Sequence, residues 1–390
     1  MKNSSLYSNL LRPLLFRLDP EFAHRQAIRA GNWLSHWKLG RRLLRKQYCV
    51  HRQELCIQAA GLEFQNPVGL AAGFDKHGNI YPVIADLGFG HMEIGSVSAL
   101  PWRGNPSPTL LRLPQDGGLI NRPGLNSEGS SAVYRRLKDA TFDMPTGINI
   151  VKTADPTIAG ACAIDDYLSC FSKFHPLADF ITLNLSCPNT SEGRTFEDPE
   201  TLAPFLYQLK ATRASLVKGN APKPIFIKLS PDLDDEMLFE ILSLAREVGI
   251  EGCVVSNTTV HRENLKTSDR VLKSFGFGGV SGRPLKRYVH RMIHKIRSKI
   301  GVDLLIIACG GVGCDPEVHP AEEVWQYLNL GATMVQLHTG LIYRGPGIAS
   351  LINNGLLEIL QRENIPSLKS FLAKRDTRRT FEEPVEQSRN

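Results

Sequence analysis

Apolar and polar positions repeat with a regular rhythm from residue 65 onward. Each repeat is a short apolar run that ends in Gly, Ser, Asn or Thr and is followed by a stretch of helical character. Because most of the runs are continuously apolar rather than alternating, they are typical of parallel strands covered on both faces. The predicted strands are 67–71, 91–97, 147–150, 180–185, 224–229, 252–256, 303–308 and 334–338, and the clearest helices are 130–139, 201–216, 234–248, 285–300 and 321–330.

Eight such strand–helix units predict an α/β fold of the (β/α)8 TIM-barrel type. A doubly wound sheet is the alternative, but it usually carries a G-x-G-x-x-G motif after its first strand, and the sequence has none. Two long gaps, residues 98–146 and 259–284, follow strand carboxyl ends, which form the catalytic face of such barrels. We expect an N-terminal helical segment (1–52), a barrel (53–370) and a charged C-terminal tail (371–390) that is loose from Lys374 onward.

The N-terminal segment has the spacing of amphipathic helices. Pro13 argues against one unbroken helix, and Asp19-Pro20-Glu21 is a typical helix start, with an N-cap Asp and a Pro in the first turn. A basic run at residues 41–46 closes the second helix. The apolar positions are Leu6, Tyr7, Leu10, Leu11, Leu14, Leu15 and Leu18 before the break, and Phe22, Ala23, Ala27, Ala30, Trp33, Leu34 and Trp37 after it.

The charge of the chain is concentrated in the same segment. The net charge of the 390 residues is +7, but residues 1–52 carry eleven Lys and Arg against two acidic residues, so the remainder is slightly acidic. An apolar face with Trp and a basic edge predicts binding to an anionic membrane surface. A second interpretation is a pair of helices packed on the barrel with a solvated basic face. Nucleic-acid binding is a third, but no matching motif accompanies the charge, so we expect no nucleic-acid partner.

Composition excludes several classes of protein. With 42% apolar and 22% charged residues the chain is an ordinary globular one, and no run of 18 apolar residues could span a membrane. Its eight cysteines form no C-x-x-C pair and no zinc-type spacing, so we expect free thiols in a reducing compartment and no metal. H-E-x-x-H is absent, and the first residues do not resemble a secretory signal.

Glycine and asparagine crowd the predicted strand ends. Glycines after the seventh and eighth strands, at 310–313 and 340, would let backbone amides reach a phosphate, although tight turns also require glycine. Asparagine offers a donor and an acceptor, so several on one rim could recognise a ring with N–H and C=O edges; turn capping is the alternative role. The five asparagines are Asn121, Asn149, Asn184, Asn189 and Asn257.

Two lysines and one cysteine complete the candidate chemistry. Lys76 and Lys228 follow or end predicted strands, so they would point into the mouth and favour an anionic ligand or a ring that gains negative charge; ordinary surface lysines are the alternative. Cys187 follows the fourth strand beside Pro188. A thiolate there could remove a proton from carbon, although most cysteines are inert and buried.

These motifs resemble the dihydroorotate dehydrogenase family, specifically its quinone-dependent, membrane-associated class 2 branch. The likeness runs from residue 16 to residue 347. The motifs that carry it are AAGFDK (71–76), EIGSV (93–97), GNPSP and LRL (104–113), GLINRPGLN (118–126), NLSCPNT (184–190), IKLSPDL (227–233), SNTT (256–259), GGVSGRPL (278–285) and CGGV (309–312).

The resemblance implies oxidation of dihydroorotate to orotate with FMN, in de novo pyrimidine biosynthesis, and electron transfer to a quinone that enters beneath the N-terminal helices. It implies a peripheral enzyme on the cytoplasmic side of a cell inner membrane, with a mitochondrial membrane as the alternative. The expected base is Cys187. The expected FMN contacts are Ala71, Ala72, Gly73, Ser96, Asn149, Asn184, Lys228, Ser256, Gly282, Gly311, His338 and Thr339. The expected substrate contacts are Lys76, Asn121, Arg122, Pro123, Gly124, Leu125, Asn184, Asn189, Asn257 and Thr258.

The sequence departs from the class 2 pattern at four places. Cys187 replaces the usual serine base, and His338 replaces a tyrosine. The segment after the third strand reads Val-Lys-Thr at 151–153, and the substrate loop reads NRPGL, with Pro123 and Leu125. Two alternative functions keep the same fold: an FMN oxidoreductase that acts on another dihydropyrimidine, and a membrane-associated barrel that has lost its activity.

Overall fold

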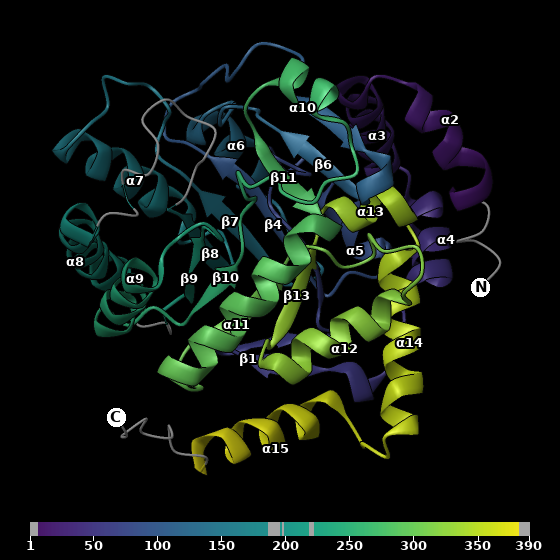
Figure 1. Cartoon of the computed structure of the whole chain (residues 1–390). Coiled ribbons are helices and arrows are strands. Elements are labelled where there is room, and N and C mark those ends of the chain that lie inside the picture. Colours follow the sequence, from purple (N-terminus) through teal and green to yellow (C-terminus); the bar gives the residue numbers. More distant parts are fainter. Residues whose placement is uncertain (1–6, 186–195, 197–198, 218–221, 382–390) are drawn as a thin grey trace.

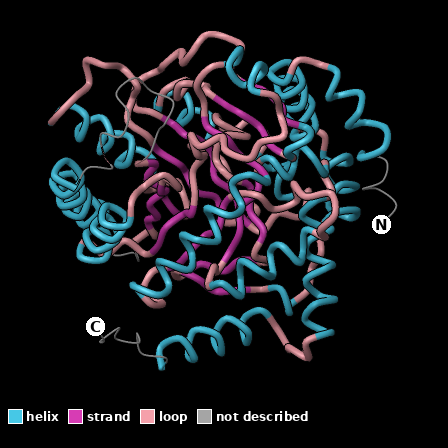
Figure 2. Tube along the Cα trace, viewed as in Figure 1, coloured by secondary structure: helices cyan, strands magenta, loops and turns pink. Residues whose placement is uncertain are grey.

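The computed structural model describes residues 7–185, 196, 199–217 and 222–381. At its centre, parallel strands pair in the order β10-β12-β13-β3-β4-β7-β8-β9 and close into a barrel through β9 and β10 (Figures 1 and 2). The predicted (β/α)8 fold is therefore confirmed, and all eight predicted runs form barrel strands. They are β3 (Val68–Leu70), β4 (His91–Val97), β7 (Thr146–Ile150), β8 (Phe180–Asn184), β9 (Ile225–Leu229), β10 (Gly252–Val255), β12 (Leu305–Cys309) and β13 (Met334–Leu337).

Helices surround the barrel, and each of the five helices expected from the sequence forms. Every residue of β7, β8, β9 and β10 is buried, which explains why these strands are apolar on both faces. Asp234 caps α9 by accepting a hydrogen bond from Met237 N. The outer helices are α5 (Tyr81–Asp86), α6 (Ser130–Leu137), α7 (Ala161–Phe174), α8 (Pro199–Leu216), α9 (Asp235–Glu247), α11 (Lys286–Ile300), α12 (Pro320–Leu330) and α14 (Ile348–Arg362).

A small antiparallel sheet lies over the barrel mouth. Its order is β11-β6-β5, and it is built from the two long gaps in the sequence pattern. The strands are β5 (Leu110–Leu113), β6 (Gly118–Asn121) and β11 (Gly279–Gly282), and the short helices α10 (Asp269–Phe275) and α13 (Thr339–Arg344) lie near them. The sheet has a separate apolar core that includes Ile120, Phe275 and Val280. Strands of four residues in Pro- and Gly-rich segments give no periodic signal, and the sequence pattern did not predict them.

The opposite end of the barrel carries the hairpin of β1 (Ile57–Ala59) and β2 (Leu62–Phe64), and the C-terminal helix α15 (Leu368–Phe381). Figure 1 shows α15 lying across this end of the molecule. A loose tail from Lys374 was expected, and this expectation is wrong for residues 374–381. The helix is held because Arg375, although charged, is buried and donates to the carbonyls of Leu328 and Ala332, at 2.5 and 2.6 Å.

The N-terminal segment consists of a π-helical turn, η1 (Tyr7–Leu11), and the helices α2 (Arg12–Arg17), α3 (Pro20–Ser35) and α4 (Lys38–Tyr48). Pro13 lies in the first turn of α2, where its missing N–H leaves no helical hydrogen bond unmade. The predicted restart at Asp19 is confirmed, since its carboxylate accepts from Phe22 N at 2.8 Å. In Figure 1 these helices cover one side of the barrel mouth.

We expect Arg375→Ala to lower the free energy of unfolding by roughly 1–3 kcal/mol, because two buried carbonyls lose their donor. Urea denaturation followed by circular dichroism measures the change. The control is Arg378→Ala on the same helix, whose side chain is exposed. Equal losses in the two variants would show that the buried hydrogen bonds do not hold α15.

Candidate functional site

A chain of side-chain hydrogen bonds crosses the barrel mouth. Ser96 Oγ on β4 donates to Asn149 Oδ1 on β7 at 2.5 Å, and Asn184 Nδ2 at the end of β8 donates to Ser96 Oγ at 3.2 Å. Asn257, which follows β10, donates from Nδ2 to Asn184 Oδ1 at 3.4 Å. Ser256 Oγ is turned to the carbonyl of Asn257, at 2.8 Å. The chain therefore gathers side chains from four strand ends, with donors and acceptors that suit a flat polar ring.

Lys228 lies beside this chain. It is paired with Asn184 in the register of β8 and β9, and its side chain is only 7% exposed. Within the described residues its ammonium group has no hydrogen-bond or ion-pair partner. A buried cation without a protein anion is costly unless a ligand or water compensates it. The position therefore favours a ligand that carries or gains negative charge.

Two glycine-rich turns meet after β12 and β13. Gly310, Gly311 and Gly313 have φ values of 134°, 84° and 75°, which side chains rarely adopt. A side chain at Gly340 would collide with the carbonyl of Val312, so the two turns are in close contact. These glycines have no side chains of their own, and their backbone N–H groups suit a phosphate group, which this fold commonly binds here.

The small antiparallel sheet of β5, β6 and β11, which we call the lid, also reaches the glycine-rich turns. Ser281 Oγ on β11 and Thr339 Oγ1 at the start of α13 form a hydrogen bond of 2.9 Å. Gly282 has a φ of 88°, and a side chain there would collide with the backbone of Gly117. The lid therefore approaches the glycine-rich turns closely.

The rim on the lid side holds Asn121 and Thr258. Asn121 Nδ2 donates to Gly279 O at 3.2 Å, and Thr258 N donates to Asn257 Oδ1 at 2.9 Å. The hydroxyl of Thr258 is buried and has no partner among the described residues. A ligand that supplies an acceptor or a donor at this point would satisfy it.

The loop after β6 is held in an unusual backbone conformation. Gly124 and Leu125 have φ values of 67° and 56°, and Asn105 N donates to Pro123 O at 3.0 Å. Next in the chain, Asn126 Oδ1 accepts a hydrogen bond from Lys76 Nζ. The loop thus holds the Lys76 ammonium group at the mouth.

Arg122 is directed toward the lid. Its guanidinium carbon lies 4.5 Å and 5.2 Å from the ring centres of Phe275 and Phe277, and Nε donates to Pro108 O at 3.0 Å. These contacts join the loop after β6 to α10. The arginine therefore has a structural function at this rim.

The turn at residues 71–76 links two strands of the barrel at the mouth. Ala71 N donates to β13 and Gly73 N donates to β4, at 2.9 and 2.7 Å, and Ala72 lies half-buried between them. The Asp75 carboxylate accepts from the backbone N–H groups of Asn79 and Ile80. Burial raises the pKa of Asp75, although these N–H groups oppose the shift. The turn is thereby held in place from both sides.

An aromatic contact joins the mouth to the N-terminal segment. His24 on α3 meets Phe74 edge to face at a ring distance of 5.2 Å, and Phe74 meets His338 in the same way at 5.7 Å. Burial lowers the pKa of His24 to about 4, with Lys76 adding to the effect. Burial also lowers the pKa of His338 to about 3, with His24 and Lys228 adding to it. Both rings are therefore neutral near pH 7.

Polar contacts fasten the N-terminal segment to the lid. The Glu21 carboxylate accepts from Ser107 Oγ at 2.6 Å and from the backbone and hydroxyl of Thr109. Arg112 on β5 donates to Leu18 O at 2.7 Å. Burial alone would raise the pKa of Glu21, but the hydrogen bonds from Ser107 and Thr109 outweigh it and hold the pKa below the ordinary value.

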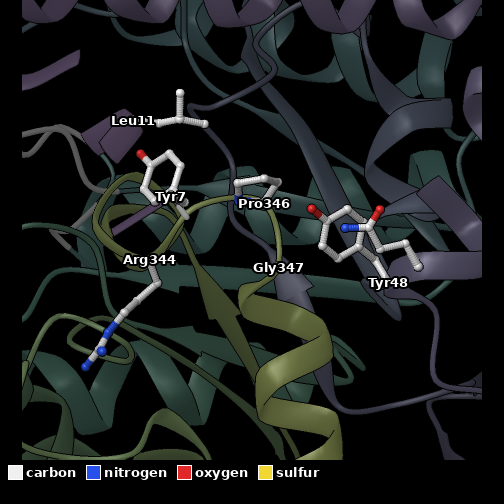
Figure 3. Close-up of a pocket in the computed structure, with 7 residues that line it drawn as sticks. Tyr7, Leu11, Tyr48, Arg344, Pro346 and Gly347 are labelled. Atoms are coloured by element: carbon white, nitrogen blue, oxygen red, sulfur yellow. The ribbon is translucent and has the colours of Figure 1, made fainter. Parts of the chain in front are cut away.

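A small cavity of about 100 Å³ lies at the start of this segment (Figure 3). Tyr7 and Tyr48 lie on two sides of Pro346, whereas the guanidinium of Arg344 points away. The hydroxyl of Tyr7 donates to Ile342 O at 2.7 Å. The cavity lies beyond the far end of α13 from Thr339, so it is not part of the mouth. Its lining residues are Tyr7, Leu11, Gln47, Tyr48, Arg344, Pro346 and Gly347.

The basic run of α4 is partly used within the molecule. Arg41 and Arg45 both form ion pairs with Asp86, which is fully buried, and with Asp143. These pairs fix α4 to the barrel. Because several cations of the segment are paired within the molecule, the basic edge is smaller than the sequence indicates. The exposed cations are Arg17, Arg25, Arg29, Lys38, Arg42, Arg45, Lys46 and Arg52, of which Arg45 is paired as above, Arg25 lies 3.8 Å from Glu21 and Arg52 is paired with Glu54.

Large apolar side chains face outward from the same segment, and we call them the N-terminal apolar surface. Trp33 is 66% exposed and Leu14 is 53% exposed. Among the described residues, no helix is both long and apolar enough to cross a membrane. Exposed large apolar side chains gathered on one segment are typical of interaction surfaces. Its members are Leu10, Leu11, Leu14, Leu18, Phe22, Trp33, Trp37, Leu39 and Leu43.

Some site residues lie outside the described part of the chain, and others escaped sequence reasoning. Cys187 and Asn189 fall in the segment that is not described. Within the described ranges, no three His, Cys, Asp or Glu side chains gather closely enough to hold a metal ion. The sequence reasoning passed over Glu93 and Gln336, polar residues inside apolar strand runs, and His24 and Phe74, which only the fold brings to the mouth.

Known proteins resemble this chain over most of its length. The family model described as dihydroorotate dehydrogenase matches residues 54–360. A dihydroorotate dehydrogenase (quinone) of Thermobifida fusca is 37% identical over 368 residues, which cover 93% of this chain and 95% of the relative. The protein of the same name from a Nostoc species is 36% identical over 384 residues, covering 94% and 98%.

A solved structure shares the fold. The DHODH of Eimeria tenella, crystallised in complex with ferulenol, has a TM-score of 0.78 and 29% sequence identity, and the match covers 92% of this chain and 96% of that one. The likeness includes the N-terminal part of this chain, since the barrel alone would cover less.

We expect Glu21→Gln to lower the free energy of unfolding at pH 7 by about 1 kcal/mol, because an amide accepts the three hydrogen bonds less well. The native pKa of Glu21 is lowered, so its contribution is complete above the unfolded-state pKa of about 4.3 and is lost as the pH falls through the native pKa. The difference between wild type and variant should therefore shrink in acid.

Urea denaturation at pH 7 and at acidic pH measures this difference. The control is Glu63→Gln on the β1–β2 hairpin, where the side chain is exposed. A difference that stays constant with pH would contradict the role of the Glu21 carboxylate.

Proposed function

The chain belongs to the dihydroorotate dehydrogenase family, and we propose that it oxidises dihydroorotate to orotate with FMN and passes the electrons to a quinone. In this proposal it acts in de novo pyrimidine biosynthesis, attached peripherally to the cytoplasmic side of a cell inner membrane. The barrel binds cofactor and substrate, and residues 1–52 serve the quinone and the membrane. The carrying observation is the contact from His24 through Phe74 to His338, which joins the polar mouth to the outward-facing N-terminal segment.

The mouth suits FMN. The turns at 310–313 and Gly340, with Gly282 and Thr339 beside them, would hold the phosphate through backbone amides. The chain of Ser96, Asn149 and Asn184 would run along the polar edge of the ring. When bound, FMN supplies the hydride acceptor and stores electrons between the two half-reactions. The Lys228 ammonium, which has no partner among the described residues, would stabilise the negative charge that the ring gains.

The substrate would lie on the lid side of the same ring. Asn121, Asn257 and Thr258 would bind the amide edges of dihydroorotate, and Lys76, held by Asn126, would bind the carboxylate. Cys187 would act as the base: its thiolate takes the proton from C5 while the hydride leaves C6. Holding two rings in reacting geometry supplies much of the acceleration.

The quinone would approach through the N-terminal segment. His24 and His338 are neutral near pH 7, because burial lowers the pKa of both. A neutral aromatic route suits an uncharged quinone. The quinone would reach the FMN ring by way of Phe74, on the side opposite the substrate. This arrangement would let the two half-reactions use opposite sides of one cofactor.

The N-terminal apolar surface supports membrane attachment. Its leucine and tryptophan side chains face outward, and Arg42, Lys46, Lys38 and Arg29 lie on the same helices and are exposed. Apolar side chains would enter the lipid boundary while these cations meet anionic head groups. The attachment should therefore weaken as salt concentration rises.

Anaerobic mixing with dihydroorotate tests the function, since it should bleach the flavin absorbance of the wild type. Cys187→Ala should still bind FMN and orotate, but its flavin should bleach roughly 10²–10⁴-fold more slowly, as when a general base is removed. Cys187→Ser should recover part of the rate. Stopped-flow spectroscopy measures all three, and the wild-type rate should rise with pH as the thiol ionises.

The control for Cys187 is Cys162→Ala, which changes an exposed free cysteine on α7. It should bleach at the wild-type rate. Wild-type flavin that dihydroorotate does not bleach would refute the proposed activity, whereas an unchanged rate in Cys187→Ala would refute only the base.

A Leu14→Ser and Trp33→Ser double variant tests membrane attachment. It should bind vesicles of anionic lipid at least tenfold more weakly, since the surface loses two large apolar side chains. Vesicle flotation measures the bound fraction. Leu100→Ser with Phe277→Ser is the matched control, because these residues are 53% and 57% exposed and lie outside the N-terminal apolar surface. Equal losses in both double variants would argue against this surface.

A further inference from the structure

One carboxylate inside the barrel is bonded to three other strands. We propose that Glu93 is a positioning residue that sets the donor and acceptor direction of the whole hydrogen-bond chain at the mouth. The proposal rests on the proposed function, in which that chain binds the cofactor ring and the substrate. Glu93 itself would touch neither; it would act through Asn149.

Glu93 is surrounded by hydrogen-bond donors. It lies on β4 and is completely buried. Asn149 Nδ2 on β7 donates to its Oε2 at 2.8 Å, while Thr182 Oγ1 on β8 and Gln336 Nε2 on β13 donate to its Oε1, at 3.0 and 2.7 Å. Three donors converge on the two oxygens of the carboxylate, which accepts from all of them.

The direction of the chain follows from this carboxylate. An ionised carboxylate only accepts, so Asn149 must turn its NH2 group to Glu93 and its carbonyl oxygen to Ser96. Ser96 then donates its proton to Asn149 and accepts from Asn184 Nδ2. This leaves Asn184 Oδ1 to accept from Asn257 Nδ2, so each amide has one orientation.

Gln336 shows how strongly the carboxylate demands donors. Its Nε2 is turned to Glu93, and its Oε1 is buried without a hydrogen-bond partner among the described residues. A flipped Gln336 would place its oxygen against the carboxylate of Glu93, where two acceptors repel. The molecule therefore leaves a buried oxygen unsatisfied in order to give Glu93 its third donor.

Glu93 and Lys228 act on the same side chain of β12. Burial raises the pKa of the Cys309 thiol, while Lys228 lowers it and Glu93 raises it further. Both charges therefore lie within reach of one side chain on β12. Removing the negative charge should make the bound flavin easier to reduce, in the direction opposite to the loss of Lys228.

Glu93→Gln tests the proposal because it keeps the shape and removes the charge. A carboxamide can accept from some of its neighbours but must also turn an NH2 group toward one of the three donors. Asn149 then has two competing orientations, and the chain loses its single direction. We expect FMN and orotate to bind at least tenfold more weakly and the flavin reduction potential to become more positive. Fluorescence titration, flavin difference spectra and redox titration measure these three quantities.

Thr182→Val is the matched control. It also removes a hydrogen bond from the Glu93 carboxylate, but Thr182 is not a member of the chain. It should destabilise the barrel about as much as Glu93→Gln and leave both affinities and the potential near those of the wild type. Equal changes in both variants would reduce Glu93 to a structural role and overturn the proposal, as would wild-type affinities in Glu93→Gln.

A compensating variant covers the case in which Glu93→Gln does not fold. In Glu93→Gln with Asn149→Asp the carboxylate moves one position along the chain, where it still accepts from Ser96. Partial recovery of FMN binding supports the proposal, and a folded double variant that binds no FMN overturns it. FMN binding is read without turnover, so wild-type protein that binds FMN but is not bleached by dihydroorotate would refute the activity and leave the test of Glu93 standing.

Discussion

Closure of the barrel is the constraint on which the rest of the structure depends. Pairing of β13 with β3 places Leu337 beside Leu70 and joins the last strand to the first. A closed parallel barrel has no free edge, so every carboxyl end points to one mouth and side chains from strands far apart in sequence meet there. Side chains inside the barrel are buried, so its polar groups depend largely on one another for hydrogen bonds. The convergence of Asn149, Thr182 and Gln336 on Glu93 is a consequence of that requirement.

The N-terminal segment distributes its polar and apolar side chains differently from the barrel. Polar and charged groups, including Glu21, Arg41 and Arg45, attach it to the barrel and the lid. Ile28, Leu34 and Leu44 pack against the hydrophobic core, but the nine large apolar side chains of the N-terminal apolar surface face outward. A segment that exists to be buried in a soluble core would show the reverse arrangement. The N-terminal segment thus presents to its surroundings a more apolar surface than a helix of an ordinary soluble domain does.

Sequence reasoning succeeded where the physical signal is local. Most barrel strands are continuous apolar runs, and Asn149 and Asn184 could be placed at the mouth because strand ends can be located. It failed where long-range contacts decide. Arg41 and Arg45 looked like free cations because their partners, Asp86 and Asp143, are far along the chain. Residues 374–381 looked like a solvated tail because only the fold provides buried carbonyls for Arg375.

The hairpin of β5 and β6 contacts both the N-terminal segment and the rim of the barrel mouth. Glu21 accepts a hydrogen bond from Thr109, the residue just before β5, and Arg112 of β5 donates to Leu18 O between α2 and α3. Asn121 ends β6, paired with Leu110 at the other edge of the same ribbon. Asn121 therefore stands on the same hairpin that Glu21 and Arg112 tie to the N-terminal segment, so the position of this rim residue depends on contacts made outside the barrel.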